Sequence, residues 1–400
     1  MDSPPTAPAR WRTVVGTLAL TEIVSWGILY YTFGVLVPPM QAELGWSQGM
    51  LGGAFSLALF VSAFLALPVG RWLERHGPRG LMTLGSCAGV VLVFAWSEVE
   101  HPLAFFALFL AFGFPLASVL YEAAFAAVIG FLGRGRRTDV ALLFLTIVAG
   151  LANTVFVPLT QWLVDAHGWR AALRVLAVVL GAITIPLHAL VLRGVPGRSA
   201  HGASRERVPA GASVEFSRLG LYLCAVAFAL AQVAGTALGV YLLPILVEQG
   251  FDASFAAAAV SLTGIGQVFG RPLFTWLRPR YSLGFWSVVL FLPFAVVVGV
   301  LALEPSRAVV LACVFVMAMV SGSLTLARTT WTLELFPVPC FARVNGVLGL
   351  WSLIGRAGAP LAMGAAHDVF GSHRVGLVAL VIACLVGGAC AWVAARLGRK

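Results

Sequence analysis

The chain has 400 residues, of which 60% are hydrophobic and only 10% charged, and its mean hydropathy is +0.95. Soluble domains carry about a quarter charged residues, so this composition indicates a polytopic membrane protein and leaves no room for a large soluble domain. The net charge of +10 does not indicate a nucleic-acid partner, because the basic residues are spread over many short segments.

Apolar stretches long enough to cross a bilayer, about 20 residues each, recur along the whole chain. The first is too long for the apolar region of a signal peptide, so we expect it to remain as a spanning helix. One set lies near residues 13–37, 49–70, 80–97, 104–131, 140–164 and 171–192, and a second near 217–246, 254–270, 283–303, 308–333, 344–366 and 375–395.

The two sets are separated by one long polar stretch, residues 193–216, whose Gly, Ser, Pro and Arg content is typical of a solvated linker. We therefore predict an N-terminal six-helix bundle over residues 1–192 and a C-terminal six-helix bundle over 217–400. With the N-terminus inside, 20 of the 26 Lys and Arg residues fall in cytoplasmic segments and four in outer loops. By the positive-inside rule, this distribution predicts twelve transmembrane helices with both termini cytoplasmic.

Two matched segments indicate that the chain contains one membrane half twice. Residues 34–45 (GVLVPPMQAELG) and 239–250 (GVYLLPILVEQG) share five residues at a constant offset of 205, and a second match follows at an offset of 200. Internal duplication is typical of secondary transporters. The expected fold is therefore all-α, with two pseudo-symmetric bundles.

Residues 70–79, between the second and third predicted spans, read GRWLERHGPR, and this segment resembles the loop signature of the major facilitator superfamily. The matching residues are Gly70, Arg71, Glu74, Arg75, Gly77 and Arg79, with Gly270 and Arg271 in the second copy. Glu74 stands where that family usually has Asp. A carboxylate among arginines can cap a neighbouring helix and clamp the two bundles, and plain positive-inside anchoring is the alternative. The second copy has no acid, so a clamp there would be weaker.

Within that superfamily, residues 25–31 (SWGILYY) and 38–40 (PPM) resemble bacterial carriers of monocarboxylates and of oxalate and formate. The resemblance implies the family's fold, a place in the bacterial inner membrane and a monomeric carrier. The chain departs from the pattern twice. Span 254–270 lacks the cation usual in those carriers, and residues 150–158 lack the Gly-Pro-x-x-Gly-Gly pattern of proton-coupled drug antiporters.

Four ionisable residues lie inside apolar runs, namely Glu22, Glu122, Arg328 and Arg356. Each would cost about 2.5–3.5 kcal/mol at the centre of a membrane helix if nothing offset it. Arg356 has small neighbours that leave room for a ligand carboxylate, which a guanidinium binds in bidentate fashion. In the resembled carriers the same span carries a substrate-binding cation. The alternative is a structural ion pair of Arg356 with Glu22 or Glu122.

Glu22 is followed by Trp26 and Tyr30 on one helical face, and Tyr31 comes next. We predict that these aromatic residues line the substrate cavity and that the carboxyl group, held against them in its protonated form, couples transport to protons. A permanently hydrogen-bonded carboxyl group is the alternative. Glu122 is a second proton-coupling candidate. It differs from Arg328 by 206 positions, close to the repeat offset, which suggests a gate or a static charge pair across the central cavity.

No catalytic motif, metal-ligand spacing or phosphate-binding glycine loop is present, so we expect no enzyme activity, no cofactor, no metal site and no ATP-driven transport. The sequence predicts alternating-access transport of a small organic anion, in particular a monocarboxylate, coupled to protons or to exchange, with the ligand bound at the midplane between the halves. Efflux of amphiphilic compounds and a non-transporting membrane sensor are the other hypotheses.

Overall fold

The computed structural model describes residues 7–133, 135–195, 217–303, 305–336 and 341–397, and the described residues form helices and no strands. Most of the predicted linker, residues 196–216, lies outside this part of the chain. The first group of helices is α1 (Ala7–Trp26), η1 (Gly27–Tyr31), α2 (Thr32–Leu44), α3 (Gln48–His76), α4 (Pro78–Ser97), α5 (Pro102–Val119), α6 (Tyr121–Leu132), α7 (Arg136–Gly150) and α8 (Ala152–Val191). The second group is α9 (Arg218–Glu248), α10 (Ala253–Leu277), η3 (Arg278–Arg280), α11 (Leu283–Leu301), α12 (Arg307–Leu335), α13 (Phe341–Phe370) and α14 (Arg374–Leu397).

Eleven helical segments in the described part of the chain are long and apolar enough to cross a membrane. One of them, Arg136–Val191, has 56 residues, more than twice the length that one crossing needs. Gly168 interrupts it with a left-handed backbone (φ 79°, ψ 162°). Only glycine adopts this conformation without strain, so the sequence marks the point where this long segment changes direction.

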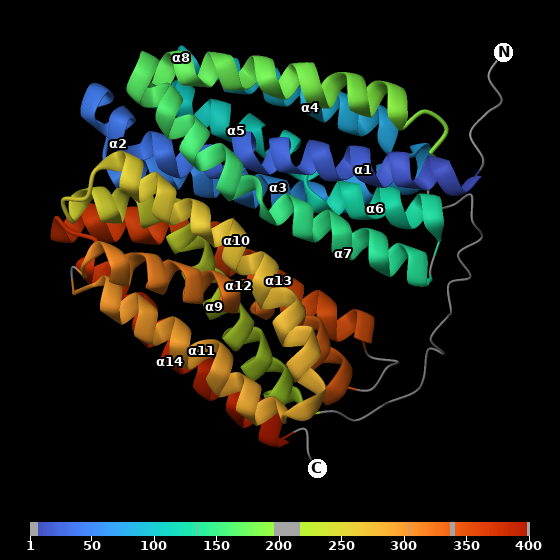
Figure 1. The fold of residues 1–400 in the computed structure, drawn as a ribbon, viewed down its shortest axis with the longest axis vertical. Helices are drawn as coiled ribbons and strands as arrows, with labels where there is room; N and C mark the ends of the chain where they lie inside the picture. Colours follow the sequence, from blue (N-terminus) through green and yellow to red (C-terminus); the bar gives the residue numbers. More distant parts are fainter. Residues whose placement is uncertain (1–6, 134, 196–216, 304, 337–340, 398–400) are drawn as a thin grey trace. The chain divides into compact units, whose positions relative to one another are not determined.

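The chain divides into two compact units. Unit 1 contains residues 1–45 and 57–205, and unit 2 contains residues 46–56 and 206–400, so the first turns of α3 belong to unit 2. In unit 1, α1 packs against α7 and α8, and α4 packs against α5 and α8 (Figure 1). Apolar side chains such as Val14, Leu18, Leu73 and Met82 form its core.

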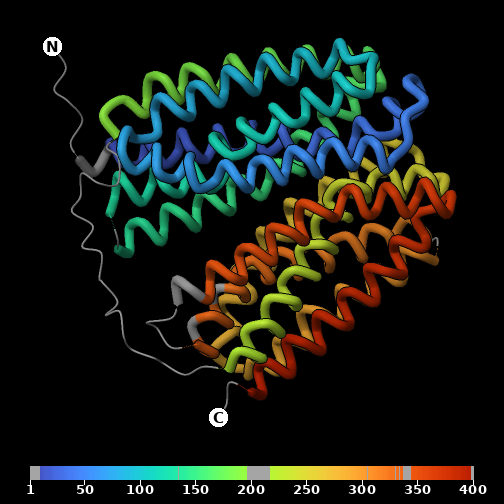
Figure 2. The backbone as a smooth tube through the Cα atoms, turned by 180° about the vertical axis from the view of Figure 1, so that it is seen from behind, coloured from blue at the N-terminus to red at the C-terminus, as the bar shows by residue number. Residues whose placement is uncertain are grey.

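Unit 2 repeats these neighbour relationships in the order of the sequence duplication. Helix α9 packs against α13 and α14, and α11 packs against α12 and α14 (Figure 2). Small residues allow the close approach that membrane helices need in the absence of a hydrophobic drive. At Gly270, for example, an added side chain would collide with the backbone of Met319, so α10 and α12 lie in direct backbone contact.

Candidate functional site

The first span contains an irregular turn one helical turn after Glu22. Residues Gly27–Tyr31 form the π-helical turn η1, and the Thr32 hydroxyl donates a hydrogen bond to the Gly27 carbonyl oxygen at 3.0 Å. A side chain at Gly27 would collide with the ring of Phe156 on α8, which explains why glycine occupies this position. Single π-helical turns inside helices frequently occur at functional sites.

The fourth span is also interrupted. Leu120 has an extended backbone (φ −89°, ψ −172°) and separates α5 from α6, so the continuous helix expected over residues 104–131 is two helices. Glu122 lies in the first turn of α6, where a carboxylate interacts favourably with the positive end of the helix dipole. The break therefore supplies local stabilisation for an acid that the sequence alone places inside an apolar run.

Aromatic side chains join the two irregular points. The ring centroid of Trp26 lies 5.1 Å from that of Tyr30, 5.9 Å from that of Tyr31 and 4.9 Å from that of Tyr121. The Tyr121 ring in turn stacks on Phe125 at 5.2 Å. The structure thus brings the three predicted aromatic residues together and adds Tyr121 and Phe125. Tyr121 and Phe125 have only a weak signal in the sequence: they lie on either side of Glu122 and four residues apart, so they share one helical face.

Glu22 is fully buried, and neither carboxylate oxygen has a hydrogen-bond partner among the described residues. The hydroxyl group of Ser25, one turn along α1, is buried in the same way. The indole of Trp26 and the carboxyl group of Glu122 both lie within electrostatic range of Glu22. A carboxyl group is costly in such surroundings, so Glu22 is a candidate for a functional role.

Arg356 is half-buried on α13. Gly355 allows α13 to approach α9 closely, since a methyl group there would lie 2.5 Å from the Ala229 carbonyl oxygen. Pro360, one turn further on, has no N–H to donate to the carbonyl oxygen of Arg356. A methyl group at Gly358 would meet no described atom within 4 Å. The role of Arg356 as an anion ligand stays a prediction.

Arg328 lies half-buried on α12, where the Thr332 hydroxyl donates a hydrogen bond to its carbonyl oxygen at 2.8 Å. Arg328 and Arg356 belong to unit 2, whereas Glu22 and Glu122 belong to unit 1. Within unit 1 the two acids are near each other. The expected pairing of these acids with the two arginines stays a prediction.

The residues of the family signature are mostly helical. Residues 70–76 are the last turns of α3 rather than a loop, and Gly77 (φ 75°) connects α3 to α4. The Arg79 guanidinium donates a hydrogen bond to the Ala189 carbonyl oxygen on α8 at 2.8 Å, which fixes the start of α4 within unit 1. A surface cleft of about 390 Å³ is lined by Ala66, Leu67, Gly70, Arg71, Glu74 and Arg75.

The second copy of the signature has a different local role from the expected loop. Gly270 lies within α10, and the Ser323 hydroxyl donates a hydrogen bond to its carbonyl oxygen at 3.0 Å. Arg271 is 5% exposed and donates to the Gln267 side chain at 3.2 Å. Arg278 forms an ion pair with Glu334 at the end of α12. The acid that this copy lacks in sequence is thus supplied from another helix.

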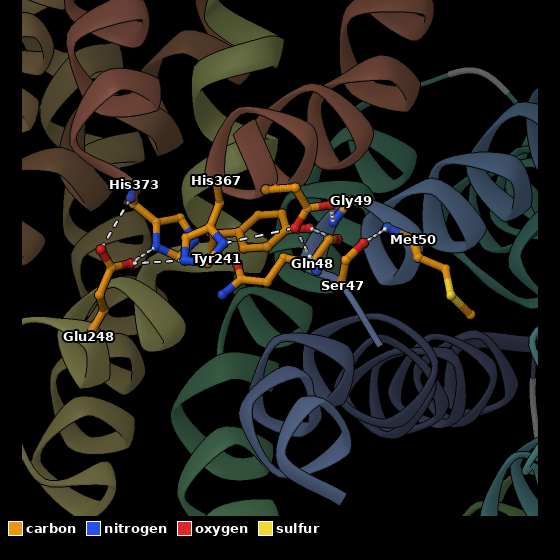
Figure 3. Close-up of polar contacts among 9 residues, drawn as sticks. Ser47, Gln48, Gly49, Met50, Tyr241, Glu248, His367 and His373 are labelled. Atoms are coloured by element: carbon orange, nitrogen blue, oxygen red, sulfur yellow. Dashed lines mark hydrogen bonds and ion pairs between the residues drawn. The ribbon is translucent and has the colours of Figure 1, made fainter. Parts of the chain in front are cut away.

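Two acids related by the 205-residue repeat have equivalent positions but different partners. Glu43 accepts hydrogen bonds from Trp169 Nε1 at 2.7 Å and from Arg170 Nε at 2.9 Å. Glu248 accepts a hydrogen bond from the backbone N–H of His373 at 3.2 Å and also pairs with its ring (Figure 3). Burial lowers the pKa of His373 below the usual histidine value, against the opposing effect of Glu248, so this imidazole is neutral at physiological pH.

Apolar helices long enough to span a membrane and a packing pattern that is repeated in two units define a polytopic membrane protein with an internal duplication, as is typical of secondary transporters. The family model of the Major Facilitator Superfamily matches residues 18–360. The chain belongs to this superfamily, a family of membrane transporters, and the resemblance drawn from residues 70–79 is confirmed.

Curated relatives also agree with the resemblance to monocarboxylate carriers. Monocarboxylate transporter 13 of Bos taurus is 26% identical over 400 residues, which cover 94% of this chain and 87% of the relative. Monocarboxylate transporter 11 of Homo sapiens is 27% identical over 286 residues, or 69% of this chain. The chain spans 58% of the length of that second relative.

Solved structures share the fold over nearly the whole chain. A bacterial homologue of the human lysosomal transporter Spinster, in an inward-facing and unoccupied conformation, matches with a TM-score of 0.73 and 17% identity over 99% of both chains. The nucleoside transporter NupG matches with a TM-score of 0.73 and 14% identity, covering 98% of this chain and 99% of its own. At these identities the likeness shows the fold alone.

Proposed function

We propose that this protein is a secondary transporter of small organic anions, in particular monocarboxylates, driven by protons or by exchange. The observation that carries the proposal is Glu22, a fully buried carboxyl group without a hydrogen-bond partner among the described residues. A buried polar group of this kind costs free energy, and ionisable residues that are kept inside membrane helices despite this cost commonly mark functional sites. The names of the curated monocarboxylate transporters supply the substrate class.

In the proposed cycle, Glu22 carries the proton and Arg356 binds the carboxylate of the substrate. A guanidinium binds a carboxylate through two parallel hydrogen bonds, and Arg356 is half-buried on α13 rather than exposed. Glu122 lies near Glu22 and is the second candidate for the proton carrier. The pair Glu122 and Arg328 forms and breaks as the carrier alternates its access.

The same proposal includes twelve spans in the bacterial inner membrane, both termini in the cytoplasm, and a monomeric carrier. The left-handed Gly168 within the 56-residue segment supports two crossings there. The outer arginines support the orientation, because three of them pair with acids near span ends: Arg170 with Glu43, Arg174 with Glu98, and Arg307 with Asp252.

Uptake of labelled monocarboxylates into proteoliposomes under an imposed pH gradient tests the proposal. We expect an acidic exterior to accelerate uptake, and we expect unlabelled carboxylates to compete where their neutral amides do not. Liposomes without protein correct for diffusion of the protonated acid. Lack of gradient-stimulated or exchange uptake for any short monocarboxylate would contradict the proposal.

The aromatic cluster of Trp26, Tyr30, Tyr31, Tyr121 and Phe125 favours a second candidate, the efflux of amphiphilic compounds. Flat aromatic side chains bind apolar and cationic ligands without a fixed hydrogen-bond pattern. In that case export of an amphiphilic dye would not depend on Arg356, and monocarboxylates would not compete with it. Ligand binding without any flux would instead favour a membrane sensor.

A further inference from the structure

Two histidines and one glutamate meet in unit 2, outside the site described above. Glu248 ends α9, His367 lies near the end of α13, and His373 lies in the connection to α14. Each offers one ligand atom, and these atoms all lie within 4.8 Å of one another (Figure 3). The centroids of the two imidazole rings are 4.5 Å apart. The group thus has the residue types and the spacing of a transition-metal site.

Hydrogen bonds within the chain account for the contact of Glu248 with His373 but not for the rest of this arrangement. His373 is 2% exposed, and its Nε2, like Nδ1 of His367, is buried without a hydrogen-bond partner among the described residues. The Nε2 atom of His367 lies 3.6 Å from Oε2 of Glu248, beyond the range of a good hydrogen bond. Two imidazoles therefore face a single carboxylate, and a hydrogen bond from His373 to Glu248 leaves the ring of His367 without a hydrogen-bond partner in the described part of the chain.

The repeat supplies an internal comparison. At the equivalent position in unit 1, Glu43 is neutralised by the guanidinium of Arg170 at 2.9 Å. In unit 2 no arginine or lysine among the described residues forms an ion pair with Glu248, whose partners are the two histidines. Where the first copy uses a cationic side chain, the second copy offers metal ligands instead.

We propose that Glu248, His367 and His373 bind a divalent transition-metal ion, with Zn²⁺ as the best match to two imidazoles and a carboxylate. Hard ions such as Mg²⁺ and Ca²⁺ prefer all-oxygen sites, whereas Zn²⁺ accepts nitrogen and oxygen ligands in tetrahedral sites. Three protein ligands leave the fourth position for water. The His373 ring would bind the metal through the nitrogen that faces Glu248 and would carry its one proton on the other ring nitrogen, so a neutral imidazole releases no proton on binding.

Asp368 gives the site a second layer that extends to α3. Its Oδ1 lies 3.9 Å from Nδ1 of His367, so a shift of about 1 Å would bring it within hydrogen-bond range of a metal-bound histidine, the contact that orients such a ligand. The same carboxylate accepts hydrogen bonds from the backbone N–H groups of Gln48 at 3.0 Å and Gly49 at 2.9 Å. The Tyr241 hydroxyl donates to the Gln48 carbonyl oxygen at 3.0 Å. Metal binding would therefore stabilise the first turn of α3 together with α9 and α13.

The sequence gives no indication of this site, because the three ligands come from separate parts of the chain and follow no metal-binding motif. Only the packing of α9 against α13 and α14 brings them together. The proposal is independent of the transported substrate, and a binding measurement tests it without any transport assay.

Calorimetric titration of the full-length, chelator-treated protein in detergent with Zn²⁺ is the direct test. We expect one Zn²⁺ per chain, and a loss of affinity of at least about 10-fold in Glu248→Gln and in His367→Ala, since even second-layer changes cost 10- to 100-fold. Glu43→Gln is the matched control and should bind as the wild type does.

A second measurement does not depend on the variants remaining folded. Zn²⁺ should raise the thermal unfolding temperature of the wild-type protein, and Mg²⁺ should not. Co²⁺ should give visible absorption bands that disappear in His367→Ala. Absence of saturable Zn²⁺ binding, or equal affinity in the wild type, Glu248→Gln and His367→Ala, would overturn the proposal.

Discussion

The rings of Trp26 and Tyr121 lie 4.9 Å apart, where two interrupted helices of unit 1 meet. Trp26 ends α1 one turn after Glu22, and Tyr121 begins α6 directly before Glu122. The ring contact therefore brings together two turns that each carry a carboxyl group. Both residues proposed to carry the proton, Glu22 and Glu122, therefore belong to unit 1.

Arg356 is expected to determine the affinity for the substrate. Arg356→Ala should raise the KM for a labelled monocarboxylate by about 10- to 150-fold, because a hydrogen bond to a charged group contributes about 1.5–3 kcal/mol. The KM of Arg356→Lys should lie between that of the wild type and that of Arg356→Ala, since lysine keeps the charge and loses the bidentate geometry. Arg307→Ala, which removes only a surface partner of Asp252, is the control. An unchanged KM in Arg356→Ala would remove this residue from the binding site.

Gly27 is expected to be intolerant of substitution. A methyl group there would collide with the Phe156 ring, and forced packing of this kind costs about 1–3 kcal/mol. Thermal unfolding in detergent should show a lower midpoint for Gly27→Ala, and the same substitution should lower the midpoint less when it is made in a Phe156→Ala background. Gly16→Ala is the matched control on α1, because no atom lies within 4 Å of the added carbon. Equal midpoints for the two single variants would argue against a close contact of η1 with α8.

The membrane crossings at Gly168 can be tested by chemical labelling. In a cysteine-free background, His167→Cys should react with a membrane-impermeant thiol reagent added outside the cell, because the connection after α8's first half is predicted to be external. His76→Cys, at the end of α3, should react only after permeabilisation. Both side chains are exposed in the structure. Labelling of both positions from the same side would contradict the proposed topology.

Hydropathy and repetition predict much of the architecture, because spanning helices must satisfy their backbone groups internally and so leave long apolar runs. The association of Glu22 with Trp26 and Tyr30 was also predictable, since residues four apart share a helical face. The break at Leu120 was not, because that position has neither glycine nor proline to mark it. The apolar segment expected over residues 104–131 is present, and the structure shows that it consists of two helices.

The other features that sequence analysis missed are contacts between residues far apart in the chain. The Arg278–Glu334 ion pair and the group of Glu248, His367 and His373 join residues that are distant in sequence. The repeat did single out Glu43 and Glu248 as equivalent acids. The partners of these two acids do not follow the repeat, because Glu43 pairs with Arg170 in unit 1 whereas Glu248 pairs with histidines in unit 2.

The most direct test of the account is proton movement driven by substrate in Glu22 variants. Proteoliposomes containing a pH-sensitive dye should acidify on addition of a monocarboxylate with the wild-type protein, beyond the rate in protein-free liposomes. Glu22→Gln, which keeps the shape and removes the titratable group, should bind the same substrate in a thermal-shift assay and abolish this acidification, and Glu22→Asp should retain part of it. Wild-type proton flux per transported substrate in Glu22→Gln would contradict the assignment of Glu22 as the proton carrier.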